Sequence, residues 1–281
     1  GSEMCIRDSN RVRNHMELGI KNKTALITGA SKGLGFYIAS ALAKEGCNIG
    51  ICARNKDEIK SAEKKLTKLG IKVLGIEADV TTNEGTNEAY SATVNSIGPI
   101  DILINNVGGS TGRTFDTTTD EDWKNTFDLN LLSGVQLIRL CLPDMKNKSW
   151  GRIINISSIY GREYGGGLTY MATKSALISM SKHLALDLAG TGITVNTIAP
   201  GSIYFEGGRW ERFQKENTKE FVEDFIKNNL PMGKFGWPEP VADLATFLAS
   251  NNADLITGTS INVDGGQSKS CLLYTSPSPR D

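Results

Sequence analysis

A tyrosine and a lysine one helical turn apart are the residues of this sequence best suited to acid–base chemistry. Tyr170 and Lys174 stand four positions apart at the start of an expected helix, so both side chains lie on one face. A nearby ammonium group favours the phenolate and lowers the pKa of a phenol from its usual value of ~10. The pair could then give and take a proton near neutral pH. Pairs at this spacing are common in helices, so the surrounding residues decide its meaning.

A glycine-rich segment near the N-terminus has the composition of a phosphate-binding loop. Residues 28–35 read TGASKGLG and begin at the last residue of the apolar run 24–28, the first expected strand. Glycines let backbone N–H groups approach a pyrophosphate, and the following helix N-terminus adds favourable partial charge. Between a strand and a helix, this spacing predicts a dinucleotide site. The candidate cofactor-binding residues of the loop are Thr28, Gly29, Ser31, Lys32, Gly33, Leu34 and Gly35.

The end of the second expected strand indicates which nicotinamide cofactor binds. An NAD enzyme usually places an acidic residue there to bind the adenosine 2′-OH. Here Ala53 holds that position, Arg54 follows it, and Lys32 can reach the same area. Two cations suit a 2′-phosphate, because charge-assisted hydrogen bonds to phosphate are strong. We therefore expect NADP(H) rather than NAD(H); the alternative is that both cations are solvated surface residues.

Short apolar runs alternate with longer amphipathic segments along the chain. The expected strands are 24–28, 48–52, 72–77, 101–105, 152–156, 194–198 and 260–264, and the expected helices run to about 45, over 56–69 and 84–96, from about 120, and over 169–189. Alternation of this kind implies parallel strands with right-handed crossovers, and continuously apolar strands imply helices on both faces. The sequence predicts an α/β fold: a single Rossmann-type doubly wound domain with a seven-stranded parallel sheet. Residues 202–230 break the rhythm and predict a mobile aromatic flap with one or two helices.

Composition limits the classes of function. Hydrophobic residues make up 39% of the 281 positions, charged residues 22%, and the formal net charge is zero, which gives no reason to expect a nucleic acid or a membrane as partner. Two histidines argue against a histidine metal site or a Ser-His-Asp triad, and we expect no metal. Away from the chain ends, Cys47, Cys52 and Cys141 form no C-x-x-C pair and predict free thiols in a cytoplasmic protein.

The two ends of the chain read as foreign sequence. One inverted DNA sequence can encode both GSEMCIRD at the start and CLLYTSPSPRD at the end, as a sequencing-library adapter would. We interpret residues 1–9 and 271–281 as translated adapter and expect the domain to occupy residues 10–270.

The sequence resembles the short-chain dehydrogenases/reductases over almost all of residues 21–268. The matching motifs stand in that family's order: TGASKGLG at 28–35, ADV at 78–80, NNVG at 105–108, Asn130 in the long helix, ISS at 156–158, YMATK at 170–174 and PGSI at 200–203. The sequence departs at Val107, where alanine is usual, and in the distance between the serine and Tyr170, one residue short of the commonest value. The choice between Ser157 and Ser158 stays open for that reason; we choose Ser158, because Gly161 keeps the usual register.

The resemblance implies a role for each matched residue. Tyr170 would protonate the substrate carbonyl oxygen as the nicotinamide delivers hydride to carbon, and Ser158 would hydrogen-bond that oxygen. Lys174 would hold the nicotinamide ribose and lower the pKa of Tyr170, and Asn130 would hold a water that relays protons to Lys174. A helical asparagine satisfied by local hydrogen bonds is the alternative for Asn130. The other implied cofactor contacts are Asp79 and Val80 with adenine, Asn106 and Gly108 in the cleft, and Pro200, Gly201 and Ile203 at the nicotinamide.

We expect an NADP(H)-dependent oxidoreductase acting on a small-molecule carbonyl or alcohol, and the family's helix pairing implies a homotetramer. The alternative within enzymes is a 3-oxoacyl-carrier-protein reductase of fatty-acid synthesis. A catalytically idle dinucleotide sensor is the alternative outside enzymes, against which Ser158, Tyr170 and Lys174 argue. The resemblance implies that a carrier would dock on basic residues before the fifth strand and after the Tyr170 helix. Those places read Lys148-Ser149-Trp150 and Gly190-Thr191-Gly192, which favours a free substrate.

Overall fold

One parallel sheet organises the protein. The computed structural model describes residues 16–112 and 114–270, so both expected adapter tails lie outside the described residues. The strands are β1 (Thr24–Thr28), β2 (Asn48–Ala53), β3 (Val73–Glu77), β4 (Ile102–Asn105), β5 (Gly151–Ile156), β6 (Ile193–Pro200) and β7 (Ser260–Val263). They pair in the order β3-β2-β1-β4-β5-β6-β7, which confirms the predicted seven-stranded doubly wound fold. The order reverses between β1 and β4, where the carboxyl ends of the strands open a crevice for a ligand.

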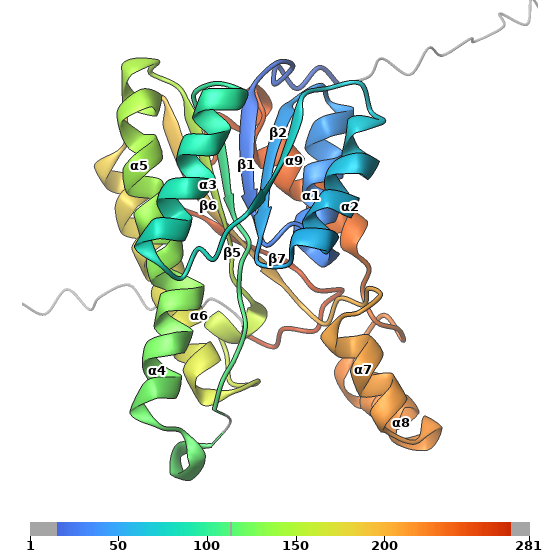
Figure 1. Cartoon of the computed structure of the whole chain (residues 1–281). Coiled ribbons are helices and arrows are strands. Elements are labelled where there is room, and N and C mark those ends of the chain that lie inside the picture. Colours follow the sequence, from blue (N-terminus) through green and yellow to red (C-terminus); the bar gives the residue numbers. More distant parts are fainter. Residues whose placement is uncertain (1–15, 113, 271–281) are drawn as a thin grey trace, which may run out of the picture.

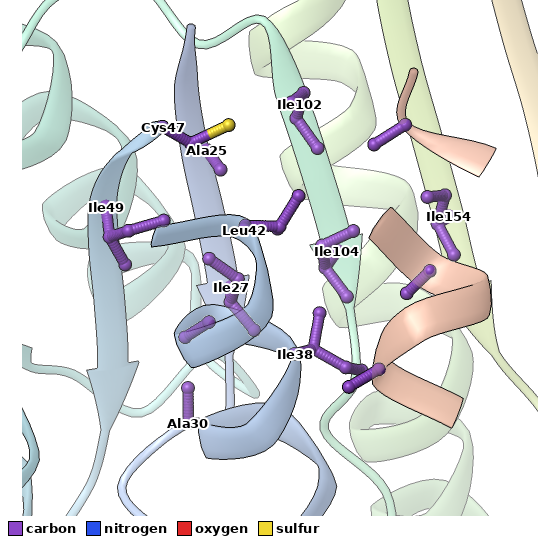
Figure 2. Packing of buried hydrophobic residues seen from close by; sticks show 14 of the residues in the cluster. Ala25, Ile27, Ala30, Ile38, Leu42, Cys47, Ile49, Ile102, Ile104 and Ile154 are labelled. Atoms are coloured by element: carbon purple, nitrogen blue, oxygen red, sulfur yellow. The ribbon is translucent and has the colours of Figure 1, made fainter. Parts of the chain in front are cut away.

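Helices cover both faces of the sheet and bury the strands β1, β4, β5 and β6 along their whole length. One face carries α1 (Gly33–Lys44), α2 (Lys56–Thr67) and α9 (Pro238–Leu248). The other carries α3 (Asn83–Ser96), α5 (Ser133–Asn147) and α6 (Leu168–Asp187). Side chains alternate along each strand: Ala25 and Ile27 belong to the layer of α1 (Figure 2), while Leu26 belongs to the opposite layer.

The first layer is packed from branched and small apolar side chains. Figure 2 shows Ile38 and Leu42 of α1 lying against Ile27 of β1 and Ile104 of β4. These four residues have no exposed surface. Helix α9 closes the same layer against α1 through Val241, and the sequence analysis did not predict this helix. This rigid layer fixes the positions of the carboxyl ends of the strands and of the loops that follow them.

The long helix expected from Asp120 is interrupted. Helix α4 (Asp120–Phe127) begins with the predicted capping box, in which the Thr119 hydroxyl accepts from Asp122 N–H and the Asp122 carboxylate accepts from Thr119 N–H. A π-helical segment, Asp128–Leu132, separates α4 from α5. Such single-turn bulges are rare and are frequently found at functional sites. The segment contains Asn130.

The predicted flap contains two short helices, α7 (Arg209–Glu216) and α8 (Lys219–Asn229). Neither helix has a buried residue, and both project from the body beyond the carboxyl edge of the sheet (Figure 1). The flap is held by its own aromatic rings. Trp210 lies 5.2 Å from Phe225 and 5.2 Å from Phe235 between ring centroids, and Phe213 lies 4.9 Å from Phe225.

Candidate functional site

The glycine-rich loop between β1 and α1 is shaped to admit a phosphate. Gly29 and Gly33 have φ angles of +61° and +59°, a region that side-chain-bearing residues rarely adopt. A Cβ at Gly35 would lie 2.6 Å from Gly29 O and 2.6 Å from Asn106 Nδ2, so only glycine fits there. Lys32 at the N-cap of α1 makes no side-chain hydrogen bond to the first turn. The N–H groups of that turn are therefore not capped by a side chain and suit an anionic group.

Thr28 and Asn106 tie this loop to the end of β4. The Thr28 hydroxyl accepts hydrogen bonds from Asn106 N (3.0 Å) and Val107 N (3.1 Å). The Asn106 amide donates in return to Thr28 O (2.9 Å) and Gly29 O (3.1 Å). Both side chains, which the sequence analysis proposed as cofactor contacts, brace the backbone of the loop in this structure.

The expected adenosine end lies where β2 and β3 finish side by side. Val80 is buried, and the Asp79 carboxylate accepts from the backbone N–H and hydroxyl of Thr81 at 3.0 and 2.8 Å. Arg54 is exposed at the end of β2. Lys32 is not a free cation here, because its ammonium group donates to Glu58 Oε1 at 2.8 Å. Sequence reasoning counted the cations of this region and missed the carboxylate of Glu58.

Ser158, Tyr170 and Lys174 come together at the carboxyl end of β5. The Ser158 hydroxyl accepts from Tyr160 N at 3.2 Å and lies near enough to the Tyr170 phenol to lower its pKa. The Ser157 hydroxyl donates instead to Lys174 O at 3.0 Å, inside α6. Of the two serines left open by the sequence, Ser158 is therefore the one that lies against the phenol.

Burial controls the electrostatics of this group. Lys174 is 2% exposed; its ammonium group donates to Ile156 O at 2.8 Å and lies 5.6 Å from the centroid of the Tyr170 ring. Loss of hydration lowers the pKa of Lys174 to about 7. Burial also raises the pKa of Tyr170, against the opposing effects of the Ser158 hydrogen bond and the positive charge of Arg209. The net direction is opposite to the lowered pKa expected beside Lys174, because desolvation outweighs the charges around the phenol.

The side chain of Asn130 makes three hydrogen bonds to neighbouring groups. Its side-chain amide donates to Gly109 O (2.8 Å) and to the Thr173 hydroxyl (3.2 Å), and its carbonyl accepts from Gly109 N (3.0 Å). A Cβ at Gly108 would lie 2.9 Å from Asn130 Oδ1 and 2.9 Å from Lys174 Nζ. The asparagine thus holds the backbone of the loop after β4 beside the lysine, in keeping with the local hydrogen bonding that the sequence analysis left open.

The segment after β6 links the sheet to the flap. Gly201 packs against Gln267, whose side-chain carbonyl accepts from Ser202 N at 2.8 Å. Ile203 is 6% exposed and belongs to the core beside α9. Farther along, the ring of Phe205 lies directly on the glycine loop: a Cβ at Gly33 would be 2.7 Å from it. Sequence reasoning included Phe205 in an aromatic flap without placing it on the loop.

A cavity of about 110 Å³ lies at the root of the flap. Ile203, Met232, Trp237 and Asp264 are among its lining residues, whereas Ser158, Tyr170 and Lys174 are not. We therefore locate the candidate active site by its chemistry, at the Ser158–Tyr170–Lys174 group. Within residues 16–112 and 114–270, no His, Cys, Asp and Glu side chains cluster as metal ligands, and no helix has the length and apolarity to cross a bilayer.

Residues 23–216 match the family described as short chain dehydrogenase. The chain belongs to this family. It is an NAD(P)-dependent oxidoreductase acting on carbonyl and alcohol groups. Among curated proteins it is similar to 3-oxoacyl-[acyl-carrier-protein] reductase FabG of Aquifex aeolicus, 35% identical over 253 residues that cover 89% of this chain and 99% of that one. It is also similar to the uncharacterized oxidoreductase YvrD of Bacillus subtilis, 36% identical over 263 residues with 89% and 98% covered.

Solved structures of this family show the same fold with a dinucleotide bound. L-sorbose reductase from Gluconobacter frateurii, complexed with NADPH and L-sorbose, superposes with a TM-score of 0.85 at 33% identity and covers 91% of this chain and all of that one. A 7α-hydroxysteroid dehydrogenase complexed with NADH has a TM-score of 0.82 at 28% identity, with 90% and 97% covered. The two neighbours carry different nicotinamide cofactors.

Proposed function

We propose that this enzyme is an NADP(H)-dependent reductase of a small carbonyl compound, or the reverse alcohol dehydrogenase, with Tyr170 as its acid/base. The observation that carries the proposal is that Ser158, Tyr170 and Lys174 lie close together at the end of β5. Gly108, in the loop after β4, lies next to Lys174. Ser158 and Tyr170 would hold the substrate oxygen, and Tyr170 would supply its proton. A bound NADPH would supply the hydride.

The glycine loop and the strand ends around it would hold the cofactor. We assign the pyrophosphate to the first turn of α1, whose N–H groups have no side-chain cap. Arg54 and Lys32 would bind the 2′-phosphate, and Lys174 would bind the nicotinamide ribose. Asn130 would act on Lys174 through a water held by the π-helical segment. The implied contacts of Asp79, Val80, Asn106, Pro200, Gly201 and Ile203 remain part of the proposal.

Oxidation of NADPH by the purified protein, followed at its absorbance with a panel of ketones, aldehydes and keto-sugars, tests the proposal. Turnover of at least one of them with NADPH supports it. Cofactor binding without turnover of any carbonyl or alcohol would favour the idle dinucleotide sensor instead.

A 3-oxoacyl-carrier-protein reductase is the second candidate, favoured by the FabG relatives. The local charges disfavour a carrier docking surface. Lys148 donates to the buried Asp101 at 2.7 Å, and Arg152 is 1% exposed, where it pairs with Asp254 and packs on the Trp150 ring. Basic residues that are already paired or buried attract an acidic carrier protein weakly.

We further propose a cytoplasmic homotetramer whose domain occupies residues 10–270. A surface groove lined by Val135, Ile138 and Leu142 of α5 and Met180 and Leu184 of α6 supports the assembly, because exposed apolar strips mark interfaces. Three buried free thiols, Cys47, Cys52 and Cys141, support a reducing compartment. Light scattering tests the assembly: a monomer would contradict it.

A further inference from the structure

A carboxylate reaches into the expected 2′-phosphate site from helix α2. Glu58 accepts a hydrogen bond from Lys32 Nζ at 2.8 Å through one oxygen and from the Ser31 hydroxyl at 3.1 Å through the other. Both partners belong to the glycine loop, and the contact spans more than twenty residues of sequence. Ser31 and Lys32, the two loop side chains best suited to bind an anion here, therefore already bind the carboxylate of Glu58.

The ordinary role of an acidic residue at this position would be to cap its own helix. Glu58 is the third residue of α2, and Asn55 is the N-cap, whose side chain accepts from Glu58 N at 2.9 Å. In a capping box the acidic side chain turns back to the N–H of the N-cap residue. The Glu58 side chain leaves its helix and contacts the glycine loop instead, so helix capping does not account for its orientation.

The pair can open without disturbing the core. The side chains of Lys32 and Glu58 are 57% and 39% exposed, and an ion pair in such a setting is weak and exchanges readily with water. The hydrogen bond from Lys32 is also the main reason that the pKa of Glu58 is lowered, so the carboxylate is charged at neutral pH. A phosphate that enters the site must displace Glu58 from Lys32, and it is repelled by the negative charge of the Glu58 carboxylate.

The other charged groups near the site leave this pair as its adjustable part. Arg54 is exposed and takes part in no ion pair among the described residues. Lys56 lies 3.6 Å from Glu77 at the end of β3, and the Asp79 carboxylate is used by Thr81. Arg54 is thus a constant attraction for phosphate, whereas the attraction by Lys32 depends on whether Glu58 holds it.

We propose that Glu58 sets the cofactor preference of this enzyme by competing with the 2′-phosphate of NADP(H) for Lys32. The inference rests on the proposed NADP(H) site and adds a specificity-determining residue to it. Glu58 weakens binding of the phosphorylated cofactor and leaves the unphosphorylated one unaffected, so NAD(H) stays within reach of the enzyme. Removing its charge releases Lys32 and removes the repulsion.

Two fragments of the cofactor isolate the effect. The Kd of 2′,5′-ADP and of 5′-AMP is measured by calorimetry for the wild type and for Glu58→Gln, at one ionic strength. We expect Glu58→Gln to bind 2′,5′-ADP roughly fivefold more tightly, because a charge at hydrogen-bond distance from the lysine is removed. Binding of 5′-AMP should change less than about twofold, since it lacks the 2′-phosphate.

Asp57→Asn is the matched control, because it removes the same charge from the same exposed helical turn. It should leave both Kd values within about twofold of the wild type. Glu58→Asp shortens the side chain and keeps the charge on the helix; it should tighten 2′,5′-ADP binding by less than Glu58→Gln does. Melting curves for each variant check that α2 stays folded.

A double-mutant comparison separates competition from general charge repulsion. Glu58→Gln changes the binding free energy of 2′,5′-ADP in the wild type and in a Lys32→Met background. We expect the change in the Lys32→Met background to be less than half of that in the wild type. An equal effect in both backgrounds, or equal effects of Glu58→Gln and Asp57→Asn, would overturn the inference while NADPH binding by the wild type stands. A wild type that binds neither 2′,5′-ADP nor 5′-AMP would overturn the proposed cofactor site itself.

Discussion

The two sides of the proposed active site are built in different ways. The side that carries Ser158, Tyr170 and Lys174 lies at the carboxyl end of β5, and every residue of that strand is buried. The opposite side is the flap, whose helices α7 and α8 contain no buried residue and rest on their own aromatic cluster (Figure 1). In the proposed enzyme, the chemistry would take place on the rigid side, and the flap would contact the variable part of the substrate.

Two contacts tie the first residues of the flap to the body. Phe205 touches the glycine loop at Gly33, and Tyr204 N donates to Gly236 O at 2.8 Å at the flap's root. Gly207 and Gly233 near the ends of the flap have φ angles of +73° and +71°, and a Cβ at either would meet no atom within 4 Å. Unpacked glycines with this backbone freedom are suitable hinge points. The comparison therefore predicts separate effects on chemistry and on substrate recognition.

The largest effect is expected on the rigid side. Tyr170→Phe removes the phenolic proton and keeps the ring, so kcat should fall by roughly 10²–10⁴-fold while melting temperature and NADPH affinity are unchanged. Steady-state kinetics and cofactor titration measure the three quantities. A variant that keeps more than about a tenth of the wild-type kcat would rule out Tyr170 as the acid/base.

The second prediction compares packing in the two regions. Leu42→Ala opens a hole in the fully buried layer between α1 and the sheet and should lower the free energy of unfolding by ~2–5 kcal/mol. Phe225→Ala removes one ring of the flap cluster and should lower it by only ~1 kcal/mol, while raising KM for the carbonyl substrate more than it lowers kcat. Urea unfolding and kinetics on both variants measure the difference. Equal losses of stability would show that the flap is part of the main core.

The same contrast explains what could be predicted from the sequence. The sheet follows from short apolar runs, and β1 begins and ends where it was expected, because strand periodicity is a local property. Spacing alone placed Tyr170 and Lys174 on one face of a helix, and the resemblance to the short-chain dehydrogenases/reductases added Ser158 to the group. The contacts of Glu58 with Lys32 and of Phe205 with Gly33 were missed, since they join segments whose approach depends on the tertiary fold.

The expected direction of the Tyr170 pKa shift differs from the structure because spacing gives no measure of burial. The spacing of Tyr170 and Lys174 predicts a lowered phenol pKa only when the ammonium charge outweighs the loss of hydration. The depth at which both side chains lie is set by how β5 and α6 pack, and spacing carries no measure of it. The sequence therefore placed Tyr170 and Lys174 on one helical face but could not give the direction in which burial shifts the Tyr170 pKa.

The third prediction uses the pKa of the buried lysine. Lys174 is charged below its pKa of about 7 and neutral above it, so a role that needs the ammonium is lost as the pH rises through that value. The pH profile of kcat/KM for NADPH, which reports on the free enzyme, should fall by about tenfold per pH unit beyond this point. A profile that stays level to about pH 9 would show that the amine keeps its proton despite burial.

The fourth prediction concerns the cofactor end of the rigid side. Arg54→Ala removes an exposed cation from the proposed 2′-phosphate site and should weaken NADPH binding by roughly fivefold. The affinity for NADH, which has no phosphate there, should stay within about twofold of the wild type. Fluorescence titration with both cofactors measures the ratio. A wild type that prefers NADH would contradict the assignment of Arg54 and Lys32.

The smallest effect is expected where the two candidate functions differ. An acidic carrier protein is attracted to exposed basic residues, but Lys148 is paired with Asp101 and Arg152 is buried. A free acyl thioester or small ketone should therefore be reduced with a kcat/KM at least equal to that of the same acyl group on a carrier protein, at equal ionic strength. The ratio should also vary little with salt, because steering by unpaired charges is the part of association that salt screens. A strong preference for the carrier-bound substrate, lost at high salt, would show that a docking surface exists and that the second candidate is correct.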